Sequence, residues 1–291
     1  MNLPPDHKQL FEEARRYEEL GDVYHATKLY KRVIKLAPEW VDAYAALGAI
    51  YFLRKEWKPC FHYCKKAVAI QPDLRDSWWQ LGIAAYALKK PRLARSVWAK
   101  FGMSDIPLQP EGLRLVYNNT FEILWMQPVN ATAARIMSIP HPDSGFRFRD
   151  LVLYNRQLIG HHIVAQKRVP VYDEMGIFKR SPYDTYSCLI HHVTEDQITQ
   201  LEKLCYDARL GFEVWSNAAR GMVVDNPQAF PEFYGRSILP NEGTEGNLHE
   251  HALVAIAAVH QAEVIHVLDA WQVIALGQYS DLRCYQNTNR R

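Results

Sequence analysis

The sequence predicts a helical repeat region followed by an α+β domain. Residues 41–72 repeat the pattern of residues 7–38, and residues 75–107 repeat it again, each time with the apolar spacing of helices. Beyond residue 145 the apolar residues change to the alternation that is typical of β-strands. A chain of 291 residues with 48% hydrophobic residues is long enough for two ordinary domains with a sizeable core.

The repeat is clearest in residues 41–72, where a first helix carries Tyr44, Leu47, Gly48 and Tyr51. In the third copy the equivalent residues are Trp78, Leu81 and Gly82, with Tyr86 one residue late. In the first copy they are Leu10, Glu13, Ala14 and Tyr17. The second helices carry Ala26 and Tyr30, Cys60 and Cys64, and Ala94 and Trp98. This spacing resembles the W-x₂-L-G-x₂-Y pattern of tetratricopeptide repeats. The resemblance covers residues 7–107 and implies three stacked helix pairs that serve as a protein-binding scaffold.

The small residues of the repeats predict close helix crossings. Gly48 and Gly82 occupy positions where a larger side chain would separate the two helices of a pair. Gly21 suits a turn with positive φ, and Lys55 and Lys89 stand at the equivalent turns of the next copies.

The resemblance also implies that the first helices line a concave groove. The matching groove residues are Phe11, Arg15, Ala45, Ala49, Phe52, Trp79, Ile83 and Tyr86. Family members that hold a C-terminal carboxylate have Lys and Asn in this groove, whereas this chain has small and aromatic residues. We therefore expect the groove to hold a partner helix or an extended apolar peptide, or to be filled by later residues of the same chain.

Composition limits the classes of partner and compartment. A net charge of +2, a pI near 8.2 and the apparent lack of a dense Lys/Arg stripe argue against nucleic acid. No run of 18 apolar residues is present, so no membrane segment is expected, and the first residues lack the apolar core of a signal peptide. Five scattered cysteines favour a reducing cytoplasm. No cofactor fingerprint occurs, and we expect no cofactor.

The region after the repeats predicts a cap and a linker. Residues 110–125 have apolar residues at helical spacing, and we expect a helix there that caps the stack. Residues 129–138 predict a further short helix, and the prolines and glycine of residues 139–147 predict an irregular linker. The domain boundaries expected from this pattern are 1–110, 111–144 and 145–291.

The last 147 residues predict an α+β sandwich. Three short strands are expected first, within DLVLYN, LIGHHIVAQ and RVPVYDE, followed by strands in TYSCLIHHV, GFEVWSN and GMVVD. A helix is expected in TEDQITQLEKLCYDAR, capped by Thr194, and another in LHEHALVAIAAVHQ, before one or two strands in EVIHVLDAWQVIAL. From TYSCLIHHV onward the order strand–helix–strand–strand–helix–strand makes a ferredoxin-like arrangement the simplest interpretation.

The chemistry-bearing residues of this domain are weak candidates for a site. A metal site would use His191, His249, Glu250 and His251, but their spacing is not that of a helical metal motif. Cys188 could pair with His162 or His191, although a buried inert thiol in an apolar strand is the simpler interpretation. The long loop at residues 225–247 contains aromatic residues and could serve recognition.

These observations favour a non-catalytic adaptor whose repeats bind a partner. The alternatives that stay open are an enzyme, metal-dependent or not, in the α+β domain with the repeats recruiting substrate, and a regulatory protein that blocks another protein through its second domain. A solved fold and a site must decide among them.

Overall fold

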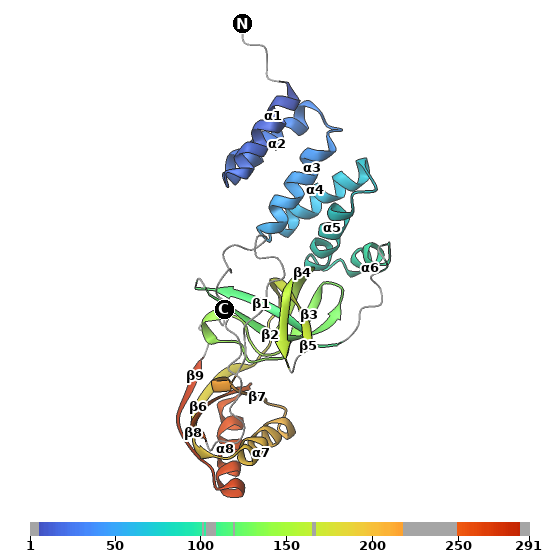
Figure 1. Ribbon diagram of the computed structural model, residues 1–291. Helices are drawn as coiled ribbons and strands as arrows, with labels where there is room; N and C mark the ends of the chain where they lie inside the picture. Colours follow the sequence, from blue (N-terminus) through green and yellow to red (C-terminus); the bar gives the residue numbers. More distant parts are fainter. Residues whose placement is uncertain are drawn as a thin grey trace. The chain divides into compact units, whose positions relative to one another are not determined.

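A computed structural model describes residues 6–100, 102, 109–118, 120–164, 167–217 and 249–285. The chain divides into two compact units, Met1–Ile106 and Pro107–Arg291 (Figure 1). The first unit is helical, and the described part of the second holds a β-barrel and a four-stranded sheet with two α-helices. No helix in the described part of the chain has both the length and the apolar character to cross a membrane.

The described residues of the first unit form three helix pairs, as the repeat predicts. The second helix of each pair contacts the first helix of the next pair, and the first helices of the second and third pairs also touch each other. The helices are α1 (His7–Glu19), α2 (Val23–Leu36), α3 (Val41–Leu53), α4 (Trp57–Ile70), α5 (Arg75–Ala87) and α6 (Pro91–Lys100).

The turns inside the three pairs share one backbone conformation. Gly21, Lys55 and Lys89 lie at successive 34-residue steps and have φ of 76°, 57° and 58°. Glycine adopts positive φ without strain, whereas the Cβ of a lysine is crowded there. The repeat therefore imposes its turn geometry even where the local sequence opposes it.

Small residues permit the close crossings that the sequence predicts. A Cβ on Gly48 of α3 would lie 2.6 Å from Cys64 Sγ of α4, and one on Gly82 of α5 would lie 3.1 Å from Val97 Cγ1 of α6. The large side chains of the repeat motif are buried, with exposed fractions of 8% or less in Tyr30, Leu47, Tyr51, Leu81 and Trp98. These contacts let stacked pairs bury apolar faces that a single pair would expose.

A closed five-stranded barrel follows the repeats. Strands β1 to β5 pair in order with antiparallel neighbours, and β5 closes the barrel by pairing parallel with β1. A short 3₁₀ helix, η1 (Pro142–Ser144), connects β3 and β4. The strands are β1 (Glu111–Tyr117), β2 (Thr120–Asn130), β3 (Ala133–Ile136), β4 (Leu151–Val164) and β5 (Lys167–Lys179).

The expected capping helix and the short helix after it are therefore wrong. Leu113 and Leu115 on β1 and Leu124 and Met126 on β2 alternate along their strands and meet in the barrel core. The same run also has apolar residues three apart, so periodicity alone did not separate strand from helix. Asn118 turns between β1 and β2 at φ 48°, a conformation that asparagine tolerates.

The strands expected at residues 150–164 are one strand. β4 runs through both segments, and its pairing with β5 shifts register between Asn155 and Gly160. Such a bulge bends a strand without ending it. The sequence therefore predicted two strands where one continuous strand bends.

The rest of the second unit is a four-stranded antiparallel sheet in the order β7-β8-β6-β9. The core formed by one sheet face includes residues of both helices, among them Leu201 of α7 and Trp271 of α8. Figure 1 shows both helices beside the sheet. The elements are β6 (Asp184–Val193), α7 (Glu195–Asp207), β7 (Gly211–Val214), η2 (Trp215–Asn217), β8 (His249–Ala258), α8 (Gln261–Ala275) and β9 (Gln278–Tyr285).

Two elements of this sheet exchange their predicted types. The expected helix in LHEHALVAIAAVHQ is strand β8, whose two faces are both buried: Val254 and Ile256 pack toward the helices, and Ala255 and Ala257 pack away from them. A strand buried on both sides is continuously apolar, and its alanines favoured a helix. The expected strand in EVIHVLDAWQVIAL is helix α8, because its buried residues recur at helical spacing: Val264, Val267, Leu268 and Trp271.

Helix α7 agrees with its prediction. The Thr194 side chain accepts a hydrogen bond from the Gln197 backbone N–H, and the Gln197 side chain reaches back to the Thr194 backbone. Glu195 and Asp196 occupy the first turn, where the helix dipole favours negative charge. The predicted strand GMVVD lies outside the described residues.

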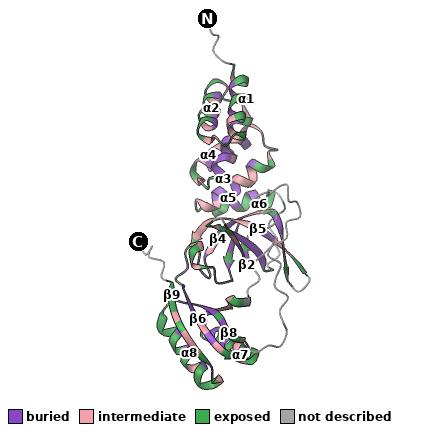
Figure 2. Cartoon of the chain, turned by 60° about the vertical axis from the view of Figure 1, so that its left-hand side comes forward, coloured by how far each residue is buried: buried purple, intermediate pink, exposed green. Residues whose placement is uncertain are grey.

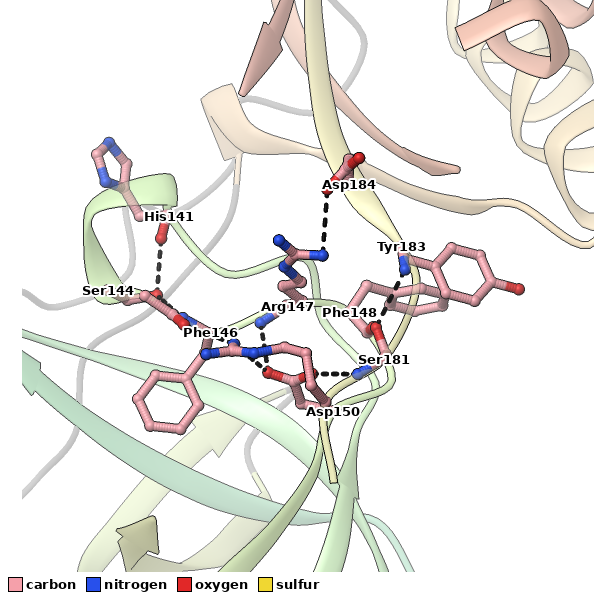
Figure 3. A network of polar contacts seen from close by, with 11 residues as sticks. His141, Ser144, Phe146, Arg147, Phe148, Asp150, Ser181, Tyr183 and Asp184 are labelled. Atoms are coloured by element: carbon pink, nitrogen blue, oxygen red, sulfur yellow. Dashed lines mark hydrogen bonds and ion pairs between the residues drawn. The ribbon is translucent and has the colours of Figure 1, made fainter. Parts of the chain in front are cut away.

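A buried polar network connects the barrel to the sheet (Figure 3). Asp150, at the start of β4, accepts hydrogen bonds from the backbone N–H groups of Arg147 (3.0 Å) and Ser181 (2.7 Å). Arg147 Nη1 lies 3.2 Å from Asp184 Oδ1 on β6, and Ile139, Phe148, Ala255 and Ala257 form an apolar cluster nearby. The pKa of Asp150 is raised by burial, an effect that the hydrogen bond from Ser181 and the charge of Arg180 oppose.

Candidate functional site

The first helices of the repeats carry the predicted groove residues. They lie on α1 (Phe11, Arg15), α3 (Ala45, Ala49, Phe52) and α5 (Trp79, Ile83, Tyr86). Their spacing of three or four residues within each helix places them on one helical side. Figure 2 shows that α3 and α5 are largely buried, which limits the surface that these helices offer.

On α1 the two groove residues differ in their surroundings. Phe11 is half-buried, with its ring centroid 5.4 Å from that of Tyr30 and 5.8 Å from that of Trp40. Arg15 is exposed and lies 3.8 Å from Glu12 and 3.9 Å from Glu19 on its own helix. On α1 an aromatic side chain that packs on other rings therefore lies one turn from an arginine paired with glutamates of its own helix.

Two of the eight groove residues are buried within the chain. Ile83 has an exposed fraction of 0%, and Phe52 has one of 5% and lies edge-on to Trp57 at 6.2 Å. Buried side chains of this kind hold the helices together, and a ligand reaches them only if the helices move. The other six predicted groove residues are half-buried or exposed.

The remaining groove residues combine small side chains with aromatic ones. Ala45 and Ala49 of α3 are half-buried. Trp79 and Tyr86 of α5 are also half-buried, and Tyr86 packs on Trp98 at 5.6 Å between centroids.

The second unit brings together two of the four predicted metal ligands. His191 of β6 lies opposite His251 of β8, with 2.8 Å between their Nδ1 atoms, so one ring donates a hydrogen bond to the other. His191 Nε2 is 2.8 Å from Ser280 Oγ of β9, a partner that no local sequence signal indicates. Glu250 is exposed, and the side chain of His249 lies outside the described residues.

Within the described part of the chain, this histidine pair lacks a third side chain with which to hold a metal. No group of three His, Cys, Asp or Glu side chains that could hold a metal occurs among the residues that the structure describes. A catalytic metal usually has three protein ligands. The pair joins three neighbouring strands through hydrogen bonds, which is a structural role that its geometry already explains.

The cysteine candidate is also inert. Cys188 is 1% exposed, and burial raises its pKa to about 12. A thiol with that pKa holds its proton at neutral pH and is a poor nucleophile. The predicted recognition loop at residues 225–247 lies outside the described residues.

No protein-family model matches the chain. A structure of YrrB, described as a TPR protein with an unusual peptide-binding site, is 20% identical and covers 33% of this chain and 49% of its own, with a TM-score of 0.31. The chain thus spans about half of that protein.

Two shorter structures are similar to the same extent. The N-terminal domain of stress-induced protein-1 from C. elegans is 20% identical, covering 32% of this chain and 80% of its own at a TM-score of 0.30. The first TPR of Spaghetti (RPAP3), bound to an HSP90 peptide, is 21% identical. The match covers 32% of this chain and 75% of that structure, with a TM-score of 0.30. By its own motif residues and helix pairs, the N-terminal unit is a stack of three tetratricopeptide repeats.

Proposed function

We propose that the protein is an adaptor whose first-helix groove binds a helix or extended apolar segment of a partner protein. The observation that carries the proposal is the half-buried set Phe11, Ala45, Ala49, Trp79 and Tyr86, which combines small with aromatic side chains on the first helices. Aromatic side chains at such positions provide much of the binding energy of protein interfaces. The absence of groove Lys and Asn favours contact with side chains over capture of a terminal carboxylate.

The proposal gives the second unit a supporting role. Its strand–helix–strand–strand–helix–strand order, with the sheet order β7-β8-β6-β9, supports a ferredoxin-like arrangement. Five free cysteines support a reducing, cytoplasmic setting.

The groove is tested by selecting peptides from a random display library on the full chain and measuring their affinity by fluorescence anisotropy. We expect Trp79→Ala to lower the affinity for the selected peptides by about tenfold or more, which is the loss expected for a central aromatic contact. Tyr24→Ala is the matched control, because Tyr24 is an aromatic residue 70% exposed on second helix α2. The proposal that the groove binds the peptides would be contradicted if wild type and Trp79→Ala had equal affinities. It would also be contradicted if the control lost as much affinity as Trp79→Ala.

The rival function, an enzyme in the second unit, rests on the 2.8 Å contact between His191 and His251. An enzyme of this kind would bind Zn²⁺ at the pair, and calorimetric titration with Zn²⁺ of wild type and His251→Ala separates the two functions. Binding in the micromolar range that is lost in the variant would favour the enzyme. No uptake of Zn²⁺ by either protein would leave the adaptor as the better account.

A further inference from the structure

The second helices of the three repeats have one sign of charge. Across α2, α4 and α6 there are ten Lys and Arg residues and no Asp or Glu. The first helices α1 and α5, by contrast, carry both signs, and the one charged residue of α3 is Asp42. We call the ten residues the basic face: Lys28, Lys31, Arg32, Lys35, Lys58, Lys65, Lys66, Arg92, Arg95 and Lys100.

The basic face has order in two directions. Along α2, Lys28, Lys31 and Lys35 recur at intervals of three and four residues and so share one side of the helix. Across the stack, charged positions recur at the 34-residue repeat step, in the rows Arg32–Lys66–Lys100, Lys31–Lys65 and Lys58–Arg92. Because stacked repeats have similar local geometry, equivalent positions lie on the same side of the stack.

These charges are open to solvent and are not neutralised by the chain. All ten residues are exposed, and the ion pairs between the described residues of the helical unit use other side chains. Lys100 instead lies 4.1 Å from the centre of the Trp78 ring, and Lys31 lies 5.6 Å from that of Tyr51.

Solvation alone does not account for this distribution. Exposed helix faces commonly mix signs, because opposite charges four residues apart stabilise a helix and like charges destabilise it. On α2, two pairs of positively charged residues have that spacing: Lys28 with Arg32, and Lys31 with Lys35. Only Lys35 and Lys100 lie in last turns, where positive charge complements the helix dipole.

We propose that the basic face binds the phosphate backbone of nucleic acid without reading its sequence. A nucleic acid presents closely spaced negative charges over a long distance, which complements rows of cations spread over three helices. Lysine contributes seven of the ten residues, and its flexible, single-point ammonium group suits phosphate contact more than base readout. The exposed ring of Tyr24, one turn before Lys28, offers a surface for base stacking.

Nucleic acid accounts for this face better than a membrane does. Helices that lie on a membrane insert a bulky apolar face beside their basic residues. Tyr30, Val33, Val97 and Trp98 of these helices are buried inside the stack, and their exposed large apolar residues are Tyr24 and Leu36, both on α2. Two residues on one helix do not form the continuous apolar face that a membrane-bound helix inserts. The site is independent of the proposed groove, since the groove residues all lie on first helices.

The test uses the full chain and a fluorescein-labelled DNA duplex of about 30 base pairs and mixed sequence, with anisotropy measured over a range of salt concentrations. We expect Arg32→Glu/Lys66→Glu, within one row, to weaken binding by about tenfold or more and to reduce the salt slope by about two. Lys8→Glu/Arg16→Glu on α1 is the control, since both residues are exposed and the change in net charge is identical. The control should retain affinity within about twofold.

Three results would overturn the proposal. Wild type could fail to bind the duplex even at low salt, the control could lose as much affinity as the row variant, or a poly-glutamate peptide or anionic vesicles could bind more tightly than the duplex. Circular dichroism checks that each variant is folded. If the Glu variant does not fold, Arg32→Gln/Lys66→Gln replaces it, and retained wild-type affinity in that variant would contradict the proposal.

Discussion

Arg180 places its Nη1 atom 2.8 Å from Oδ2 of Asp150, pairing a side chain that is 43% exposed with one that is fully buried. The same carboxylate accepts the backbone N–H groups of Arg147 and Ser181. Figure 3 shows these contacts around the passage from the barrel to the sheet. The buried partner therefore organises the junction, and the exposed partner adds to it.

This asymmetry predicts unequal effects of removing either partner. Asp150→Ala leaves two backbone donors without their acceptor and should lower the free energy of unfolding by about 2–5 kcal/mol. Arg180→Ala should cost less, about 1 kcal/mol, because water reaches the 43% exposed guanidinium and Asp150 keeps its two backbone donors. Urea unfolding of both variants measures the difference, and an equal loss for the two would contradict the assignment of the junction to Asp150.

The shared turn geometry predicts opposite effects of two substitutions. Lys89→Gly should stabilise the repeats by about 0.5–1 kcal/mol, because relief of left-handed strain exceeds the added entropy of the unfolded chain. Gly21→Ala should cost about 1–2 kcal/mol from strain alone, since no atom lies within 4 Å of the added Cβ. Urea titrations followed by circular dichroism provide the two values, and a stabilising Gly21→Ala would refute the common geometry.

Glu111 of the barrel predicts a pH-dependent contribution to stability. Burial raises its pKa above the ordinary 4.5, and the ion pair with Arg156 at 3.0 Å opposes that shift only in part. The folded state therefore takes up a proton at higher pH than the unfolded state. The contribution of Glu111 is fully present below its unfolded pKa and is lost as pH rises through the folded pKa.

The measurement is the unfolding free energy of wild type minus that of Glu111→Gln at several pH values. This difference should become more favourable to wild type as the pH falls from about 7 toward 4.5, because the variant lacks the titrating group. A change in the opposite direction would show that Arg156 outweighs burial.

The five cysteines should differ sharply in reactivity. Cys60, Cys64, Cys188 and Cys205 are buried, and Cys284 is exposed. Burial raises the pKa of Cys188 and Cys205 to about 12, which suppresses the reactive thiolate. A thiol reagent should label one cysteine rapidly in the native protein and all five after denaturation. Rapid native labelling that persists in Cys284→Ser would contradict this burial.

The repeats were predictable because their signal recurs three times. Gly48 and Gly82 identified the helix crossings, and Gly21 identified the turn geometry that Lys55 and Lys89 share. A local periodicity that appears once is weaker evidence. The β1 region had apolar residues at both strand and helix spacing, and its pairing with β2 and β5 makes it a strand.

Sequence spacing also predicted only part of the candidate sites. Sequence spacing placed the groove residues on first helices, but it did not predict that Phe52 and Ile83 would be buried. The contact of His191 with Ser280 depends on the pairing of β6 with β9, which are far apart in the chain. The basic face was overlooked because the net charge of +2 averages over the chain and conceals its segregation onto three helices.

The central claim is that a partner segment lies in the groove of the first helices. It is tested most directly by placing a photoreactive phenylalanine analogue at Ala49, which is half-buried on α3, or at Ala69, which is exposed on second helix α4. After irradiation with a peptide selected on the full chain, we expect a crosslink from position 49 and none from position 69. A crosslink from position 69 alone, with none from 49, would contradict the account.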